Sequence, residues 1–187
     1  MVDMDYQAII GFIIGISGFL LYFCSLGPTY LARVFKKESQ VMQIFFRTSG
    51  EIFLLVAIIW LALLDYKLVI NVVSILGFLL FLISVIISLI GVRNLKITSV
   101  YMTMSDKLIT KGIYTKIRHP QALARILMAF GVALLLNSQS LIWFSVLVVL
   151  PGFIIDTYIE DRELKLRFGQ QFVGYENQVS RFLPYIW

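Results

Sequence analysis

The sequence has almost no cysteine or histidine and little charge. Cys24 is the only cysteine among 187 residues, so neither an internal disulfide nor a cysteine metal cluster can form. His119 is the only histidine, so a metal site would depend on carboxylates, and we expect none. Charged residues make up 14% of the chain and hydrophobic residues 59%, with a mean hydropathy of +0.88. This balance predicts an integral membrane protein.

The first apolar run also lacks a basic segment before it. Asp3 and Asp5 precede the run, and no small-residue cleavage pattern follows it. We therefore expect a retained transmembrane helix rather than a signal peptide. Residues 184–187 carry no prenylation signal, so we expect no lipid anchor there.

Long apolar runs are abundant, and a helix needs about 20 apolar residues to cross the hydrocarbon of a bilayer. A polar tetrapeptide at 137–140 suits a tight turn, so the last two spans are expected to form a helical hairpin. Charged and apolar residues are mixed from Asp156 onward, which predicts a helix that continues into the cytoplasm with its apolar side against the bundle. The predicted fold is an all-α membrane bundle of about five spans, at 7–24, 44–64, 68–92, 122–136 and 141–159.

The distribution of Lys and Arg predicts the orientation, because cytoplasmic loops carry an excess of both. The N-terminal residues have none, the turn at 65–67 has one, and the turn at 137–140 has none. Most positive charges lie in 25–43, in 93–121 and in the tail. The N-terminus is therefore predicted outside and the C-terminus in the cytoplasm. Positive residues beside a membrane are attracted to anionic headgroups, so we expect no nucleic-acid partner.

Polar residues interrupt the apolar pattern at three places: at Arg47 and Glu51, from Lys111 to Arg125, and at Asp156 and Glu160. Arg47 and Glu51 are one helical turn apart and can pair, either as a structural anchor or as a substrate contact. Arg125 lies within two turns of the interface, where snorkelling is possible. An ionisable residue at such depth is nonetheless a functional candidate, and a charged partner is expected for it.

The predicted hairpin indicates which residues face Arg125. Reflection about the turn places it opposite Gly152 or Phe153, one turn from Asp156. Pro120 suits the first turn of the fourth span. Two interpretations remain open, a solvated helix start with one structural salt bridge or a single cytoplasmic-side cavity. The residues that would converge at such a cavity are Arg118, His119, Arg125, Asp156 and Glu160.

An ordered set of motifs covers the second half of the chain. Its members are Gly112, Tyr114, Arg118-His119-Pro120, Glu160-Asp161, Leu164, Phe168-Gly169, Phe172, Tyr175 and Arg181-Phe182-Leu183-Pro184. Their order and spacing resemble the isoprenylcysteine carboxyl methyltransferase family, which belongs with the membrane phospholipid methyltransferases. The resemblance covers roughly residues 95–187, while 1–94 matches only as three generic hydrophobic helices. We expect one membrane domain over 1–187, with a methyltransferase-like part at 95–187.

The resemblance implies a methyltransferase that uses S-adenosylmethionine. In the family the cofactor occupies a cytoplasmic pocket of the last helices and the C-terminal segment, and a lipid-borne acceptor arrives from the bilayer. The cofactor-binding residues that it implies are Gly112, Tyr114, Arg118, His119, Pro120 and Glu160. An apolar wall for adenine is available from Tyr114, Phe168 and Phe172. The candidate catalytic residues are Arg125, Asp156 and Glu160.

The sequence departs from the family pattern at several positions. Ala122 and Ala124 replace a Tyr and a Gly, and Asp161 replaces the second Glu of the acidic pair. Asp156 stands where carboxyl methyltransferases carry an Arg that is thought to hold the acceptor carboxylate. Either Arg125 replaces that charge, or Asp156 favours an amine or a thiol. The acceptor is thus expected to be a lipid or lipophilic molecule with a carboxylate, amine or thiol. A catalytically inactive scaffold and a small transporter are the alternatives, and the oligomeric state is open.

Overall fold

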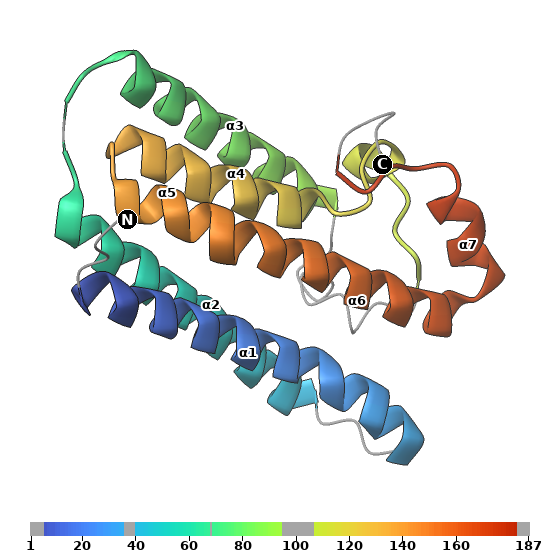
Figure 1. The fold of residues 1–187 in the computed structure, drawn as a ribbon. Coiled ribbons are helices and arrows are strands. Elements are labelled where there is room, and N and C mark those ends of the chain that lie inside the picture. The colour runs from blue at the N-terminus through green and yellow to red at the C-terminus, as the bar shows by residue number, and fades with distance from the viewer. Residues whose placement is uncertain (1–5, 36–39, 68, 95–106, 183–187) are drawn as a thin grey trace.

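The computed structural model describes residues 6–35, 40–67, 69–94 and 107–182, and these are predominantly helical (Figure 1). The only β-type pairing within these ranges is an isolated bridge between Ile117 and Ser180. The all-helical prediction is therefore confirmed for the described residues. The helices are α1 (Tyr6–Phe35), α2 (Gln40–Asp65), α3 (Val72–Asn94), the 3₁₀ turn η3 (Gly112–Thr115), α4 (Pro120–Leu135), α5 (Gln139–Phe144), the π-helical η4 (Ser145–Val149), α6 (Leu150–Phe168) and α7 (Gln170–Glu176).

Three helices of the described chain are long and apolar enough to cross a membrane. They cover Phe45–Asp65, Val72–Arg93 and Gln139–Phe168, and the last of these joins α5, η4 and α6. The apolar part of α1, Tyr6–Leu21, and α4 are shorter apolar helices. These lengths are consistent with a membrane protein, and the five-span count stays a prediction.

The helices pack in two pairs, with the long α5–α6 helix beside both. Figure 1 shows α1 along α2 and α3 along α4, while α5–α6 runs through the middle of the bundle. Close contact between α3 and α4 depends on Gly77 and Gly131. A Cβ on Gly77 would collide with the backbone of Leu135, and one on Gly131 would lie 2.7 Å from the nitrogen of Phe81. Small residues allow such close backbone approach between membrane helices.

Polar groups join two loops at the end of the bundle where α4 meets α5. The Asp65 carboxylate accepts hydrogen bonds from the Ser138 hydroxyl and from the Ser140 backbone nitrogen, the latter at 2.8 Å. The Ser138 hydroxyl in turn caps α5 by accepting a bond from the Leu141 nitrogen at 3.2 Å. These contacts tie the end of α2 to the turn between α4 and α5.

Further along, Pro151 lacks the N–H that would bond to the carbonyl one turn earlier, which accounts for the π-helical turn η4.

The helix predicted to continue beyond the fifth span is divided into two parts. α6 does continue beyond the apolar run, but it ends at Phe168, and Gly169 has φ +54° and ψ −128°. That positive φ is accessible to glycine and strained for other residues, so the chain can turn sharply here. α7 then folds back and buries Phe172 completely.

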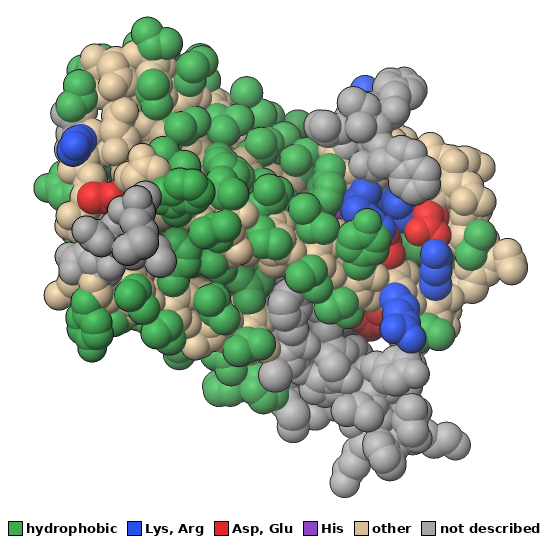
Figure 2. Space-filling model, viewed as in Figure 1, with side chains coloured by type: hydrophobic (Ala, Val, Ile, Leu, Met, Phe, Trp, Pro, Cys, Tyr) green, Lys and Arg blue, Asp and Glu red, His purple; other side chains and the backbone are tan. Residues whose placement is uncertain are grey.

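Charged side chains gather at the end of the molecule that holds α7, while hydrophobic side chains cover the middle (Figure 2). The start of α1 and the α4–α5 turn lie at the opposite end of the bundle (Figure 1). Some predictions fall outside the described residues: those on Asp3 and Asp5, on the boundary at 94/95, and on Leu183 and Pro184 of the terminal motif.

Candidate active site

Two backbone segments meet at the charged end of the bundle. Arg118 and His119 donate backbone hydrogen bonds to the carbonyls of Ser180 (2.9 Å) and Arg181 (3.1 Å). The Tyr175 hydroxyl donates to the carbonyl of Tyr114 at 2.6 Å. The residues after α7 are therefore fixed to the segment that leads into α4. Because Pro120 is the first residue of α4, His119 stands at the N-cap position of that helix.

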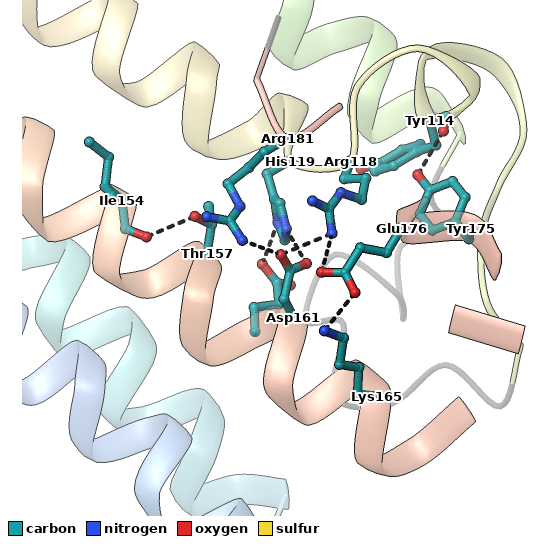
Figure 3. A network of polar contacts seen from close by, with 11 residues as sticks. Tyr114, Arg118, His119, Ile154, Thr157, Asp161, Lys165, Tyr175, Glu176 and Arg181 are labelled. Carbon is teal, nitrogen blue, oxygen red and sulfur yellow. Dashed lines mark hydrogen bonds and ion pairs between the residues drawn. The ribbon is translucent and has the colours of Figure 1, made fainter. Parts of the chain in front are cut away.

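His119 forms the centre of a buried polar network with two neighbouring carboxylates of α6 (Figure 3). Its Nδ1 lies 3.1 Å from Glu160 Oε2, and its Nε2 lies 2.7 Å from Asp161 Oδ1. Only 4% of His119 is exposed. The two oxygens approach both ring nitrogens, an arrangement that a doubly protonated imidazolium satisfies.

The environment of His119 favours its charged form. Burial alone would lower its pKa, but the hydrogen bonds to Asp161 and Glu160 and the charges of these carboxylates outweigh burial and raise the pKa to about 9. His119 is therefore a cation at neutral pH. This makes it a fixed positive charge rather than a proton acceptor at the start of α4.

Asp161 joins His119 to two arginines. Its Oδ2 accepts hydrogen bonds from Arg118 at 3.1 Å and from Arg181 at 2.8 Å (Figure 3). Arg118 also contacts Glu176 at 3.1 Å, and Glu176 binds Lys165 at 2.6 Å. The network thus connects three parts of the chain. These are the residues before α4, the middle of α6, and α7 together with the segment that follows it.

A narrow hollow with about 30 Å³ of free space lies against this network. Small-molecule pockets typically measure roughly 300–1,000 Å³, so the walls of this hollow would have to move apart to admit a ligand of that size. Arg118, His119 and Asp161 form its polar wall. Lys107 also lines the hollow, and the rest of the wall is aliphatic or aromatic: Leu108, Ile109, Tyr114, Leu164, Phe168, Phe172 and Tyr175.

Tyr114 contributes a buried hydrogen-bond donor beside this hollow. Burial, with the charge of Glu160, raises the pKa of its phenol far above the usual range, so the hydroxyl keeps its proton. Among the described residues, its oxygen has no hydrogen-bond partner. A buried donor without a partner is costly, and a polar ligand in the hollow would satisfy it.

The predicted site residues divide into three groups. Tyr114, Arg118, His119 and Phe168 line the hollow. Glu160 contacts the His119 ring and Pro120 follows His119 in the chain, and neither lines the hollow. Gly112 is exposed and starts η3 with φ +64°. Arg125 and Asp156 lie outside the His119 network, towards the middle of the bundle.

Arg125 was expected to pair with Asp156, and in the structure it forms an ion pair with Glu51. Arg125 Nη2 lies 2.6 Å from Glu51 Oε1, so the salt bridge crosses from α4 to α2. Glu51, predicted to pair with Arg47 on its own helix, thus reaches a neighbouring helix. The charge of Arg125 still acts on Asp156, and its guanidinium lies 5.6 Å from the ring centroid of Phe153.

Asp156 is almost completely buried, with 2% of its surface exposed. Its Oδ1 has no hydrogen-bond partner among the described residues. The charges that act on it come from Glu160, Arg47, Arg125 and His119. An incompletely bonded carboxylate one turn from Glu160 marks a position for a ligand that donates a hydrogen bond.

Comparison with known families agrees with this arrangement. The sequence model of the phospholipid methyltransferase family matches residues 72–171, more than half of the chain. The chain belongs to this family. The match includes α3, α4 and the α5–α6 helix, and with them His119, Glu160 and Asp161. Searches of curated proteins and of solved structures gave no match.

Membership of the phospholipid methyltransferase family supports a membrane methyltransferase and leaves the acceptor open. The matched region stops at residue 171, before Phe172, Tyr175, Glu176 and Arg181. These four residues line the hollow or bind the network. Phe172 was expected in the adenine wall, whereas Tyr175, Glu176 and Arg181 were not among the predicted site residues. Asp161 was also missed, although it belongs to the acidic pair. The terminal motif with Arg181 was the available signal for the contribution of the tail.

Proposed function

We propose that this phospholipid methyltransferase family member transfers a methyl group from S-adenosylmethionine to a lipid or lipid-linked acceptor. The observation that carries the proposal is the hollow in which aromatic side chains meet a polar wall formed by Arg118, His119 and Asp161. A nucleoside with a charged amino-acid part needs both an apolar wall and polar partners. The hollow offers both within one small space, in a chain whose family performs methyl transfer.

The residues present fit this cofactor. Tyr114, Phe168, Phe172 and Tyr175 supply aromatic surface for adenine, and the Tyr114 hydroxyl is a buried donor that lacks a partner. Arg118 and the His119 cation supply positive charge for the carboxylate of the methionine part. S-adenosylmethionine supplies an electrophilic methyl group on a sulfonium. The chain contributes by positioning, charge and exclusion of water.

Asp156 supports an acceptor that carries a proton. A buried carboxylate oxygen without a partner would accept a hydrogen bond from an amine or a thiol and hold the proton that the acceptor loses. An acceptor carboxylate would instead meet a like charge at this point. We therefore propose an amine or thiol acceptor rather than the carboxylate of an isoprenylcysteine.

Binding of labelled S-adenosylmethionine to the full chain in lipid nanodiscs tests the cofactor proposal. We expect His119→Ala and Glu160→Gln to weaken binding about tenfold or more, because each removes a charged hydrogen bond beside the hollow. Glu163→Gln is the matched control, since it changes the charge of the same helix within one turn of Glu160 and does not line the hollow. Absence of binding by the wild-type chain at millimolar cofactor would remove the proposal.

Methyl transfer is tested separately from binding. Lipid extracts are incubated with the protein and a deuterated-methyl cofactor, and the products are identified by mass spectrometry. We expect a labelled amine or thiol lipid, and Asp156→Asn to abolish its formation while cofactor binding persists. Binding with no labelled product from any extract would instead support the inactive scaffold. A labelled methyl ester would contradict the role given to Asp156.

A further inference from the structure

A second charged site lies on the bundle outside the cofactor hollow. Glu51 of α2 and Arg125 of α4 form an ion pair at 2.6 Å, with 46% and 35% of their side chains exposed. Glu51 lies within Phe45–Asp65, one of the candidate membrane spans. Charged residues within such a span are costly and mark functional positions by default.

The ion pair directly connects the two helix pairs, which otherwise meet mainly through α5 and α6. α2 packs mainly against α1, and α4 packs mainly against α3. The contact between Glu51 and Arg125 thus crosses from one helix pair to the other. A contact of this kind can be exchanged for a ligand without loss of the packing within either pair.

Charged residues continue from this pair into the bundle. Arg125 acts on the buried Asp156, as do Arg47 and Glu160. Glu160 binds His119, which lines the cofactor hollow. A series of charges therefore runs from an exposed position at bilayer depth to the proposed site of methyl transfer. Asp156, with its Oδ1 without a partner among the described residues, lies between the two ends.

We propose that Arg125 binds the phosphate of a phospholipid acceptor in exchange for Glu51, so that the rest of the headgroup reaches Asp156. This inference rests on the proposed function and names the part of the acceptor that the chain recognises. A guanidinium forms two parallel hydrogen bonds with a phosphate, and such charge-assisted pairs are strong. The Phe153 ring beneath Arg125 helps to fix the guanidinium plane. Glu51 competes for the same guanidinium and holds it when no phosphate is bound.

Lipid binding provides a test that does not need turnover. The full chain in detergent is titrated with dioleoyl phosphatidylethanolamine or with dioleoylglycerol, which has the same chains and no phosphate, and bound lipid is counted by native mass spectrometry. We expect Arg125→Gln to weaken phosphatidylethanolamine binding about tenfold. Dioleoylglycerol binding should not change, and Glu51→Gln should strengthen phosphatidylethanolamine binding because the competing carboxylate is gone.

Two controls keep the test specific. Arg93→Gln removes an exposed arginine at the end of α3, away from Glu51, and should leave lipid binding as in the wild type. Arg125→Lys keeps the charge but loses the two parallel hydrogen bonds, so it should bind phosphatidylethanolamine more weakly than the wild type while dioleoylglycerol binding stays unchanged, which tests the site if Arg125→Gln fails to fold. Equal losses in Arg125→Gln and Arg93→Gln, or equal losses for the two lipids, would overturn the proposal. Soluble glycerophosphoethanolamine that competes as well as the lipid would overturn its lipid part.

Cofactor binding, measured on the same samples, separates this inference from the proposed function. Arg125→Gln should bind S-adenosylmethionine like the wild type, because Arg125 does not line the cofactor hollow. If cofactor binding is intact but lipid binding does not depend on Arg125, the phosphate-site proposal alone is overturned. Arg125-dependent lipid binding without cofactor binding would leave the phosphate site standing and remove the methyltransferase proposal.

Discussion

At the scale of single residues, the site depends on one imidazole enclosed by opposite charges. Glu160 and Asp161 are consecutive on α6, yet they reach the two ring nitrogens of His119 from either side. Arg118 and Arg181 balance the second of these carboxylates. Each buried charge in the network therefore has a hydrogen-bonded partner of opposite sign, as buried ions require.

His119 should make the stability of the fold depend on pH in the alkaline range. Its pKa is about 9 in the folded chain against roughly 6.5 when unfolded, so the protonated form stabilises the fold. This stabilisation is complete below the unfolded pKa and is lost as the pH rises through the folded pKa. We expect the melting temperature in detergent to fall between pH 7 and pH 10.

The matched variant for this measurement is His119→Gln, which keeps hydrogen bonding and removes the titration. It should melt lower than the wild type at pH 7, and the difference should shrink towards pH 10. Lysines and tyrosines that titrate in the same range affect both proteins equally. Parallel curves for the two proteins across this range would contradict the assigned charge of His119.

Asp161→Asn should be among the most damaging single substitutions in the chain. It keeps the shape of the side chain and removes the negative charge that Arg118, His119 and Arg181 share. Removal of one partner from a buried ion pair typically costs about 3–5 kcal/mol. We expect a loss of this size in the free energy of unfolding, measured by denaturant in detergent, while Glu163→Gln should change it little.

Sequence reasoning at this scale succeeded where residues are linked by one short turn. Reflection about the 137–140 turn predicted Arg125 near Phe153, and these side chains do lie together. The contact of Arg125 with Glu51 was missed, because it depends on where α2 packs against distant parts of the chain. A local pattern carries no information about that packing. Asp161 was undervalued for a similar reason, since two of its partners, Arg118 and Arg181, come from segments that only the folded chain brings together.

At the scale of secondary-structure elements, the apolar runs predicted where the helices lie more accurately than where they end. The first run was predicted to end at residue 24, yet α1 continues to Phe35. The α5–α6 helix continues to Phe168, nine residues beyond the end of its predicted span, in agreement with the prediction that this helix runs on past the apolar residues. The length of an apolar run reflects the thickness of the hydrocarbon that a span must cross. The end of a helix is instead set by capping and backbone geometry. Gly169 provides such a stop for α6.

Gly169→Ala should therefore disturb α7 and the hollow without altering the buried core. A methyl group meets no neighbour at this position, but φ of +54° is strained for alanine. A residue forced into such a conformation costs on the order of 1–3 kcal/mol. We expect weaker cofactor binding, with a smaller change in overall melting temperature. Gly174→Ala in α7 also has open space and should bind cofactor like the wild type.

At the scale of the whole molecule, the two ends of the bundle differ in chemistry. The α7 end holds the charged network and the hollow. The other end holds the α4–α5 turn (Figure 1), to which Asp65 is bonded. Hydrophobic side chains cover the surface between them. A protein of this form suits a bilayer, with a water-soluble cofactor reaching one end and lipids reaching the sides. The excess of Lys and Arg near the α7 end predicts that this end is cytoplasmic.

Cysteine labelling tests this orientation with the full chain. In a Cys24→Ser background, Gln139→Cys places a thiol at the start of α5, and Gly174→Cys places one on α7, both at exposed positions. We expect a membrane-impermeant maleimide to label Gln139→Cys in intact cells and Gly174→Cys only after permeabilisation, because the long α5–α6 helix separates the two sites. The opposite pattern would reverse the orientation. Labelling of both thiols from the same side would show that this helix does not cross the membrane, and a lipid acceptor would then have no lateral route to Arg125.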